Sequence, residues 1–157
     1  MPTDEKIALD ALSCTIIEGN ILVPSTLEAL FENTEERPVY VNHCAGEVDI
    51  AQGYSLNVYA VNVTGTKNVS EACLKHNAKL VYISSVHAMQ PAVESNGIDP
   101  AKEYNPDTVI GLHAKVKARA SQVVPAFCSH GLNATLIQPS GLIGANDYTN
   151  TNMSEFF

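Results

Sequence analysis

Basic residues are scarce in this sequence. Lys and Arg number nine among 157 residues, against 17 Asp and Glu, so the formal net charge is -8. Nucleic acids and anionic membranes bind proteins through clustered Lys and Arg, and here the nine basic residues are scattered along the chain. The composition therefore argues against nucleic acid or an anionic membrane surface as a partner.

Cysteine motifs and long apolar runs are also missing. The four cysteines lie far apart and form no Cys-x-x-Cys pair, which argues against a zinc site and a disulfide framework. No run approaches the roughly 18 apolar residues of a membrane span, and Met1 is not followed by the basic start and apolar core of a secretory signal. We therefore expect a cytoplasmic protein with reduced thiols and no metal.

Short apolar runs alternate with longer helical patterns, as in parallel strands joined by crossover helices. The predicted strands are residues 14–17, 39–42, 80–83 and 134–138. The predicted helices are residues 24–32, 58–75 and 112–129. The sequence thus predicts an α/β fold in which residues 1–157 form a single domain.

Apolar spacing predicts which side of two helices faces inward. In the first helix the predicted inward residues are Leu27, Leu30 and Phe31. In the last helix they are spaced by three or four positions: Leu112, Val116, Ala120, Val123 and Phe127. Glycine inside the middle helix, at Gly65, costs about 1 kcal/mol relative to alanine, so we expect it to mark close packing or a neighbouring cofactor.

A serine pair and a later helix carry the pattern most informative about chemistry. The apolar strand 80–83 ends in Ser84 and Ser85, and the helix that follows places His113 and Lys117 one turn apart. Serine after a strand, then Tyr-x-x-x-Lys on a helix, is the active-site layout of the short-chain dehydrogenase/reductase family. This sequence resembles the extended branch of that family, the NAD-dependent epimerases, dehydratases and ketone reductases. Lys117 matches the lysine, Ser85 best matches the serine with Ser84 as the alternative, and His113 stands at the tyrosine position.

Four further segments between residues 16 and 144 resemble the family in the same order. Residues 18–21 are similar to its Gly-Asp-Ile/Val turn, which bonds the adenine, and residues 41–46 to the strand and loop beneath the cofactor. Residues 62–68 are similar to the start of its central helix, and residues 139–144 to the segment beside the nicotinamide. The resemblance implies an NAD or NADP site formed by Lys117 and by residues of three of these segments: Asn20, Ile21, Ala45, Gly46, Pro139 and Ser140.

The substitution at position 113 changes the implied chemistry. In the family the tyrosine exchanges a proton with the substrate oxygen, the lysine lowers the tyrosine pKa and holds the ribose hydroxyls, and the serine bonds the same oxygen. Imidazole has an unperturbed pKa of about 6.5, and the adjacent Lys117 lowers it. A neutral His113 accepts a proton but donates one poorly, and it is shorter than phenol. Two interpretations follow, a functional substitute and an inactive site, and we expect the inactive site.

A second departure concerns the cofactor pyrophosphate. Family members begin with a strand, a Gly-x-x-Gly-x-x-Gly turn and a helix that bind it, and no such motif occurs in this sequence. The residues before position 14 and after position 144 are too few for that unit and for the family's substrate lobe. We therefore expect a partial Rossmann-like sheet lacking the first βαβ unit and the C-terminal substrate lobe, with weak or absent NAD(P) binding.

A partial sheet has a structural consequence. The remaining crossover helices would all pack on one face, and a parallel sheet bare on the other face is unusual and favours association. Alternatively, residues 14–17 could pair directly with residues 39–42 through a right-handed crossover. The expected partners are thus a small-molecule substrate and a further copy of the chain, bound through helices 58–75 and 112–129 or through the bare face.

Three function classes are compatible with the pattern. The resemblance implies hydride transfer on a hydroxyl or ketone, and residues 85–88 and 111–115 are closer to dihydroflavonol and hydroxysteroid reductases than to sugar-nucleotide epimerases. We expect the chain itself to be a truncated, inactive member, with a non-catalytic binding or oligomerisation module, or the remnant of a disrupted gene, as the alternative. A hydrolase using Ser84 or Ser85 with His87 or His113 is disfavoured because no Gly-x-Ser-x-Gly elbow is present.

Overall fold

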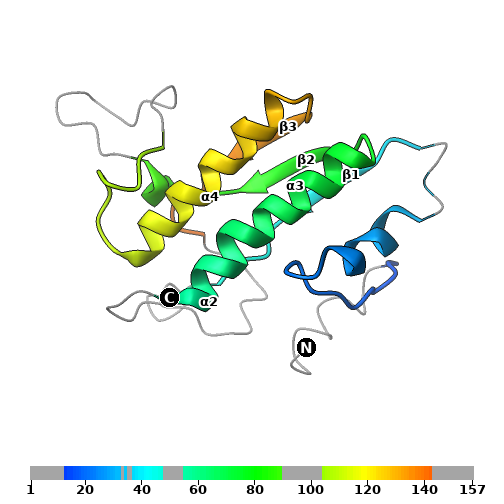
Figure 1. The fold of residues 1–157 in the computed structure, drawn as a ribbon, viewed down its shortest axis with the longest axis horizontal. Helices are drawn as coiled ribbons and strands as arrows, with labels where there is room; N and C mark the ends of the chain where they lie inside the picture. The colour runs from blue at the N-terminus through cyan, green and yellow to red at the C-terminus, as the bar shows by residue number, and fades with distance from the viewer. Residues whose placement is uncertain (1–12, 33, 35–36, 48–54, 90–103, 143–157) are drawn as a thin grey trace.

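Three parallel strands form the central sheet of the protein. The computed structural model describes residues 13–32, 34, 37–47, 55–89 and 104–142 (Figure 1). The strands are β1 (Tyr40–His43), β2 (Lys79–Ile83) and β3 (Ala134–Ile137), in the order β1-β2-β3. Both pairings are parallel, with Val41 opposite Leu80 and Leu80 opposite Ala134. The predicted α/β architecture is confirmed.

Two long helical segments connect the three strands, and shorter helical elements precede or follow them. The helical elements are η1 (Pro24–Phe31, a 3-10 helix), α2 (Leu56–Tyr59), η2 (Ala60–Thr64, a π-helix), α3 (Gly65–Lys75), η3 (Val86–Ala88, a 3-10 helix) and α4 (Leu112–Cys128). Residues Ala60 and Gly65 at the junctions keep α-helical angles, so α2, η2 and α3 form one continuous helix with a π-turn in it. The helices expected at residues 58–75 and 112–129 are therefore confirmed.

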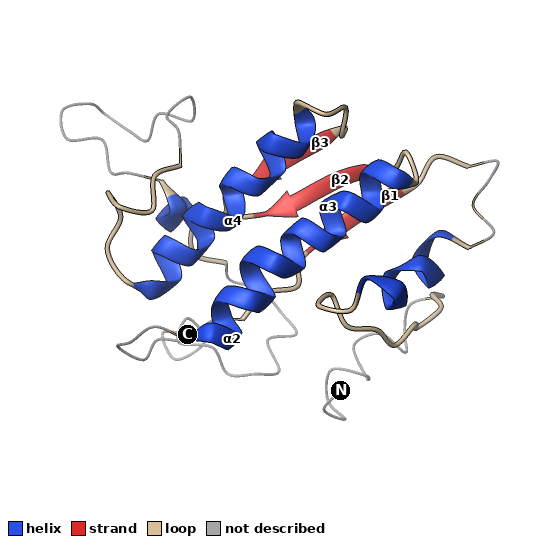
Figure 2. Ribbon diagram, viewed as in Figure 1, coloured by secondary structure: helices blue, strands red, loops and turns tan. Residues whose placement is uncertain are grey.

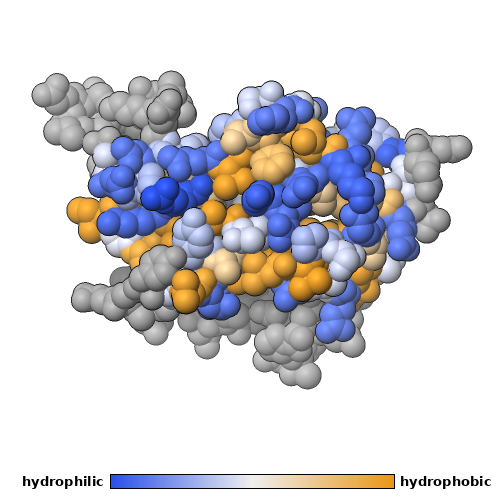
Figure 3. All heavy atoms as spheres, in the orientation of Figure 1, coloured by the Kyte–Doolittle hydropathy of each residue, from blue (hydrophilic) through white to orange (hydrophobic). Residues whose placement is uncertain are grey.

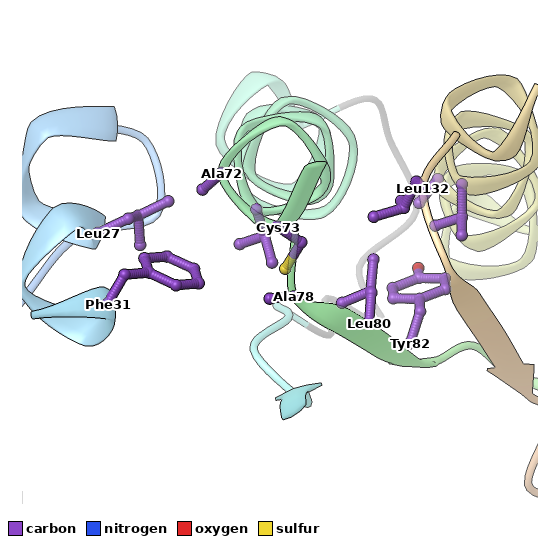
Figure 4. Close-up of a cluster of buried hydrophobic side chains, with 11 residues drawn as sticks. Leu27, Phe31, Ala72, Cys73, Ala78, Leu80, Tyr82 and Leu132 are labelled. Carbon is purple, nitrogen blue, oxygen red and sulfur yellow. The ribbon is translucent and has the colours of Figure 1, made fainter. Parts of the chain in front are cut away.

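Helices α3 and α4 cover the same face of the sheet (Figures 1 and 2). Side chains of a strand point alternately to the two faces, and on β2 the buried positions are Leu80 and Tyr82, which are 0% and 1% exposed. Both residues point toward the helices in Figure 4, where Leu27 and Phe31 of η1 approach the same core from the side of α3. The main core therefore lies between β2, the two long helices and η1.

The opposite face of the sheet is not covered by any helix that the structure describes. Tyr40 and Ile137 on this face are 65% and 45% exposed, and Asn42 and Thr135 are exposed as well. On the helix-covered side, polar side chains alternate with apolar patches (Figure 3). The expectation that the crossover helices pack on one face is confirmed for the described residues.

The predicted first strand was wrong. Residues 13–20 form no strand, and every one of them is exposed. A strand is stable only when a neighbour pairs with its backbone groups, and none of the strands in the described part of the chain lies beside residues 14–17. The alternative pairing of residues 14–17 with β1 is therefore not formed either, because the sheet ends at β1.

Two predictions of inward side chains were wrong in part. Leu27 and Phe31 are buried, but Leu30 is 45% exposed. On α4 the buried residues are mostly small, namely Ala114, Val116, Ala118, Ala120, Ser121 and Val124, whereas Leu112, Val123 and Phe127 are only partly buried. The side of α4 that carries alanine and serine faces inward, where small side chains allow close packing against α3 and η3. The spacing of apolar residues alone does not reveal such a contact.

Gly65 marks close packing, one of the two explanations predicted for it. A Cβ atom at this position would lie 2.4 Å from Cδ1 of Ile21. Nearby, the Asn68 side chain donates a hydrogen bond of 2.8 Å to the Ile21 carbonyl. The turn that leads into η1 is thereby attached to the start of α3.

Candidate active site

The predicted catalytic residues meet at the carboxyl ends of β1 and β2. His43 ends β1 and is followed by Ala45 and Gly46, while Ile83 ends β2 and is followed by the serine pair. In open α/β sheets, ligands bind at this edge. The first half of α4 packs against η3 and brings His113 and Lys117 to it.

Lys117 connects the two strand ends. Its ammonium donates a hydrogen bond of 3.2 Å to the Ile83 carbonyl and lies 5.6 Å from the centre of the Tyr82 ring. A Cβ atom at Gly46 would lie 3.5 Å from the Lys117 Nζ atom and 2.9 Å from Oδ1 of Asn62. Burial lowers the pKa of Lys117, and the nearby Cys44 thiol opposes that shift. Glycine at position 46 therefore keeps a narrow space open beside the lysine.

His113 lies one turn before Lys117 and is half-buried. Burial, the Lys117 charge and the neighbouring His87 all lower its pKa, in that order of importance. The rings of His87 and His113 stand nearly perpendicular, with centroids 6.3 Å apart. The imidazole of His113 is therefore neutral at pH 7, as predicted from the neighbouring lysine.

The two serines have different surroundings. Ser84 is 4% exposed and shares a hydrogen bond of 2.5 Å with the buried Ser121 hydroxyl on α4. Ser85 is partly exposed, and its hydroxyl accepts a hydrogen bond of 3.2 Å from the His87 backbone N–H. Of the two residues at the strand end, Ser85 is the less buried. Both hydroxyls have partners other than a histidine ring, which does not favour a hydrolase.

A buried polar group beneath the site was not assigned from the sequence. The His43 ring nitrogen Nε2 lies 3.0 Å from the Thr66 hydroxyl, which donates a hydrogen bond of 2.6 Å to the Asn62 carbonyl. Asn62, in the π-turn η2, donates to the carbonyls of Glu47 and Val58 at 2.8 and 2.9 Å. These bonds connect the loop after β1 to the central helix. The sequence marked residues 62–68 as a motif, but it gave no sign that Thr66 contacts His43, because the two residues lie 23 positions apart in the chain.

The Tyr82 hydroxyl also lies in this buried region. It has no hydrogen bond of standard geometry in the described structure. Burial raises the pKa of Tyr82 to about 12, although the nearby Thr66 and Ser121 hydroxyls partly oppose the shift. The phenol is therefore neutral at pH 7, and because Tyr82 is only 1% exposed it faces the core and not a ligand.

The remaining predicted cofactor residues lie around this edge with different roles. The side chain of Asn20 accepts a hydrogen bond of 2.9 Å from the Leu22 N–H, within the turn before η1. Ile21 packs against Gly65, as described above. Pro139 follows β3, and its carbonyl accepts a hydrogen bond of 3.1 Å from the Val86 N–H, which ties it to η3. Ser140 is exposed, and residues 143–144 lie outside the described part of the chain.

The serine geometry yields a stability prediction. Replacing Ser84 by alanine leaves the Ser121 hydroxyl buried without its partner, so we expect Ser84→Ala to lower the free energy of unfolding by about 1–3 kcal/mol. Ser85→Ala is expected to change it by less than about 0.5 kcal/mol. Urea denaturation measures both, and the double variant Ser84→Ala/Ser121→Ala should recover much of the loss. Equal losses for the two single variants would contradict the assignment.

The buried histidine yields a pH prediction. Burial, with the Lys117 charge, lowers the pKa of His43 to about 4 in the folded chain, from 6.5. Below pH 6.5 the unfolded chain therefore takes up a proton that the folded chain does not. We expect the free energy of unfolding to fall between pH 6.5 and pH 4, by about 3 kcal/mol in total at about 1.4 kcal/mol per pH unit. His43→Gln should flatten this part of the pH profile, and an unchanged slope would count against the assignment.

The chain is similar to known proteins in sequence and in fold. The pattern of the NAD dependent epimerase/dehydratase family matches residues 2–157. The chain is similar to mouse (Mus musculus) 3 beta-hydroxysteroid dehydrogenase type 7, with 26% identity over 89% of this chain and 40% of the relative. It is also similar to the decarboxylating sterol-4-alpha-carboxylate 3-dehydrogenase of Schizosaccharomyces pombe, with 29% identity over 85% of this chain and 38% of that protein. The chain thus spans about 40% of the length of these relatives.

Solved structures agree with the family match. The crystal structure of gox2253 superposes with a TM-score of 0.82 at 24% identity, over 99% of this chain and 46% of that one. The NADP complex of dTDP-4-dehydrorhamnose reductase from Bacillus anthracis superposes with a TM-score of 0.59 at 25% identity, over 80% of this chain and 42% of that one. Together with the family pattern across residues 2–157, these likenesses show that the chain belongs to the NAD-dependent epimerase/dehydratase family, within the extended short-chain dehydrogenases/reductases.

Proposed function

We propose that this chain forms the nicotinamide and proton-transfer part of an NAD(P)-dependent oxidoreductase site for a hydroxyl or ketone substrate, and that the 157-residue chain does not turn over by itself. The observation that carries the proposal is the position of Lys117, held between the Gly46 loop and the end of β2 beside Ser85. Position 113, one turn away, holds an imidazole instead of a phenol.

The residues at the strand ends fit one half of the cofactor. The space that Gly46 leaves beside Lys117 Nζ and Asn62 would be filled by any side chain at position 46, which supports close approach of a ribose to the backbone there. Ala45 beside it is also small and is exposed. Bound NAD(P) would supply the hydride acceptor or donor. The pyrophosphate half has no such support, because the sequence contains no Gly-x-x-Gly-x-x-Gly turn to provide backbone donors.

Each side chain at the site then has a defined task. The ammonium of Lys117 can donate to ribose hydroxyls, and the Ser85 hydroxyl can donate to the substrate oxygen. The neutral His113 can accept a proton from a substrate hydroxyl, but it carries no surplus proton at pH 7 to give to a developing alkoxide. Carbonyl reduction therefore lacks its proton donor.

The substrate class that we propose is a ring alcohol or ketone of the hydroxysteroid type. Two similar proteins are named as a hydroxysteroid dehydrogenase and a sterol carboxylate dehydrogenase. The similarity of segments 85–88 and 111–115 to hydroxysteroid reductases also favours this substrate class. Relatives named for sugar nucleotides are also present at comparable identity, for example a dTDP-4-dehydrorhamnose reductase of Mycobacterium tuberculosis at 28%. Steroids and sugar nucleotides share the secondary alcohol or ketone on which the site acts.

One observation favours a second, non-catalytic function. The uncovered sheet face exposes Tyr40 and Ile137, at 65% and 45%. Exposed apolar surface of this kind favours association, either through this face or through the long helices that end in Lys75 and Cys128. An oligomerisation module is therefore the alternative to a catalytic role.

Cofactor binding tests the proposal directly. Because the pyrophosphate lacks its backbone donors, we expect NAD(H) and NADP(H) to bind the isolated chain no more tightly than about 1 mM, which corresponds to about 4 kcal/mol of binding free energy. Isothermal titration calorimetry measures this, with Lys117→Ala as the control that removes the remaining ribose contact. Micromolar binding by the unmodified chain would show that the pyrophosphate is held in another way.

Catalysis is tested by restoring the missing groups one at a time. We expect His113→Tyr to remain inactive in the isolated chain, because it returns the proton donor but not the pyrophosphate site. In a chimera that supplies a glycine-rich βαβ unit and a C-terminal lobe from a related reductase, the same substitution should recover ketone reduction, and Lys117→Ala should then abolish it. Turnover by the unmodified chain that disappears in His113→Ala would overturn the assignment of an inactive site.

A further inference from the structure

Tyr82 is the penultimate residue of β2 and is 1% exposed. Its side chain points from the sheet toward the long helices (Figure 4). Lys117 on α4 lies over the face of this ring, with its Nζ atom 5.6 Å from the ring centre. The ring of His43, at the end of β1, lies beside it with centroids 5.5 Å apart and an angle of 37° between the planes. The Tyr82 ring thus meets side chains from β1 and from α4 at the candidate site.

The Lys117 ammonium has few partners that favour its charged form. Burial lowers the Lys117 pKa, so its surroundings disfavour the charge. In the described part of the chain, no carboxylate forms an ion pair with it. The groups that favour the charge are the Ile83 carbonyl at 3.2 Å, the nearby Cys44 and the electron-rich face of the Tyr82 ring. A cation within about 6 Å of a ring centre is attracted to the ring, more strongly when it is partly buried.

The hydroxyl of Tyr82 does not account for an aromatic residue at this position. It has no hydrogen bond of standard geometry among the described residues, and its two polar neighbours have other partners. Thr66 donates its only hydroxyl proton to the Asn62 carbonyl at 2.6 Å, and Ser121 shares its hydrogen bond with Ser84. What Tyr82 contributes to the site is therefore its ring, and a phenylalanine ring should serve equally well.

We propose that Tyr82 is a positioning residue for Lys117, and that the face of its ring and the adjacent Ile83 carbonyl together hold the ammonium beside Gly46. Both groups belong to β2, so the strand that leads into Ser85 also places the lysine. This role rests on the proposed function, in which Lys117 binds a ribose. The contact itself exists without a cofactor, so a chain that binds no NAD(P) would overturn the proposed function and leave the measurement below unaffected.

The test measures the charge of Lys117 in the isolated chain. Trace acetic anhydride acetylates only the neutral amine, so the labelling rate as a function of pH, read by mass spectrometry, gives a midpoint and a limiting rate for Lys117. Because Cys44 also influences the lysine, every protein compared carries Cys44→Ser. His43 and His113 lie near the same ammonium, and their lowered pKa values keep both rings neutral throughout the alkaline range of the titration.

Removing the ring should favour the neutral amine. We expect Tyr82→Leu to lower the labelling midpoint and to raise the rate about two- to fivefold on the acidic side of it, with the limiting rate unchanged. Tyr82→Phe keeps a ring and should match the parent protein. Leu80→Ala is the matched control, because Leu80 is 0% exposed and lies on the same face of β2. It loosens the core but leaves the ring beneath Lys117, so the midpoint should stay in place.

Fluorinated phenylalanines at position 82 test the ring without changing its shape. Each fluorine withdraws electron density from the ring face while adding little volume. We therefore expect mono-, di- and trifluorinated rings to lower the Lys117 midpoint in successive steps. If Tyr82→Leu does not fold, this series decides the question by itself.

Three results would overturn the proposal. A midpoint in Tyr82→Leu equal to that of the parent protein means that the ring does not stabilise the ammonium. A midpoint in Tyr82→Phe as low as that of Tyr82→Leu assigns the effect to the hydroxyl. A midpoint that is insensitive to fluorination, or that falls equally in Leu80→Ala, assigns the effect to general packing.

Discussion

The pairing of β2 on both of its edges is the constraint on which the rest of the structure depends. Val41 and Ala134 both lie opposite Leu80, so the three strands end at one edge with their carboxyl ends together. Leu80 and Tyr82 bury the inner face of β2 beneath α3 and α4. The central strand therefore fixes the positions of the Gly46 loop, the serine pair and Lys117 relative to one another.

Burial and charge act together at the strand ends. His43, His113 and Lys117 all have lowered pKa values, and burial is the first cause in each case. The Lys117 charge also disfavours protonation of both imidazoles. The outcome is one cation beside two neutral rings at neutral pH, an arrangement in which the imidazoles can accept a proton but donate one poorly.

The fold class was predictable from local signals, and so was the placement of the candidate site residues at one edge of the sheet. Serine after an apolar strand and lysine on the following helix predict that residues 85 and 117 lie at the same edge of the sheet, because strand alternation and helical spacing are properties of short segments. The choice between Ser84 and Ser85 was not settled in the same way. It depends on Ser121, which lies 37 residues from Ser84 along the chain and meets it only through the packing of α4 on β2.

The sequence by itself determined the three paired strands, the two long helices and the replacement of tyrosine by His113. The tertiary structure alone decided that residues 14–17 remain outside the sheet, since a strand needs a neighbour and local composition cannot supply one. It also decided that the small residues of α4 face inward and that Thr66 and His43 meet beneath the site. In each case the deciding factor is contact between segments distant in sequence, which hydrogen bonding and close packing select only once the chain is folded.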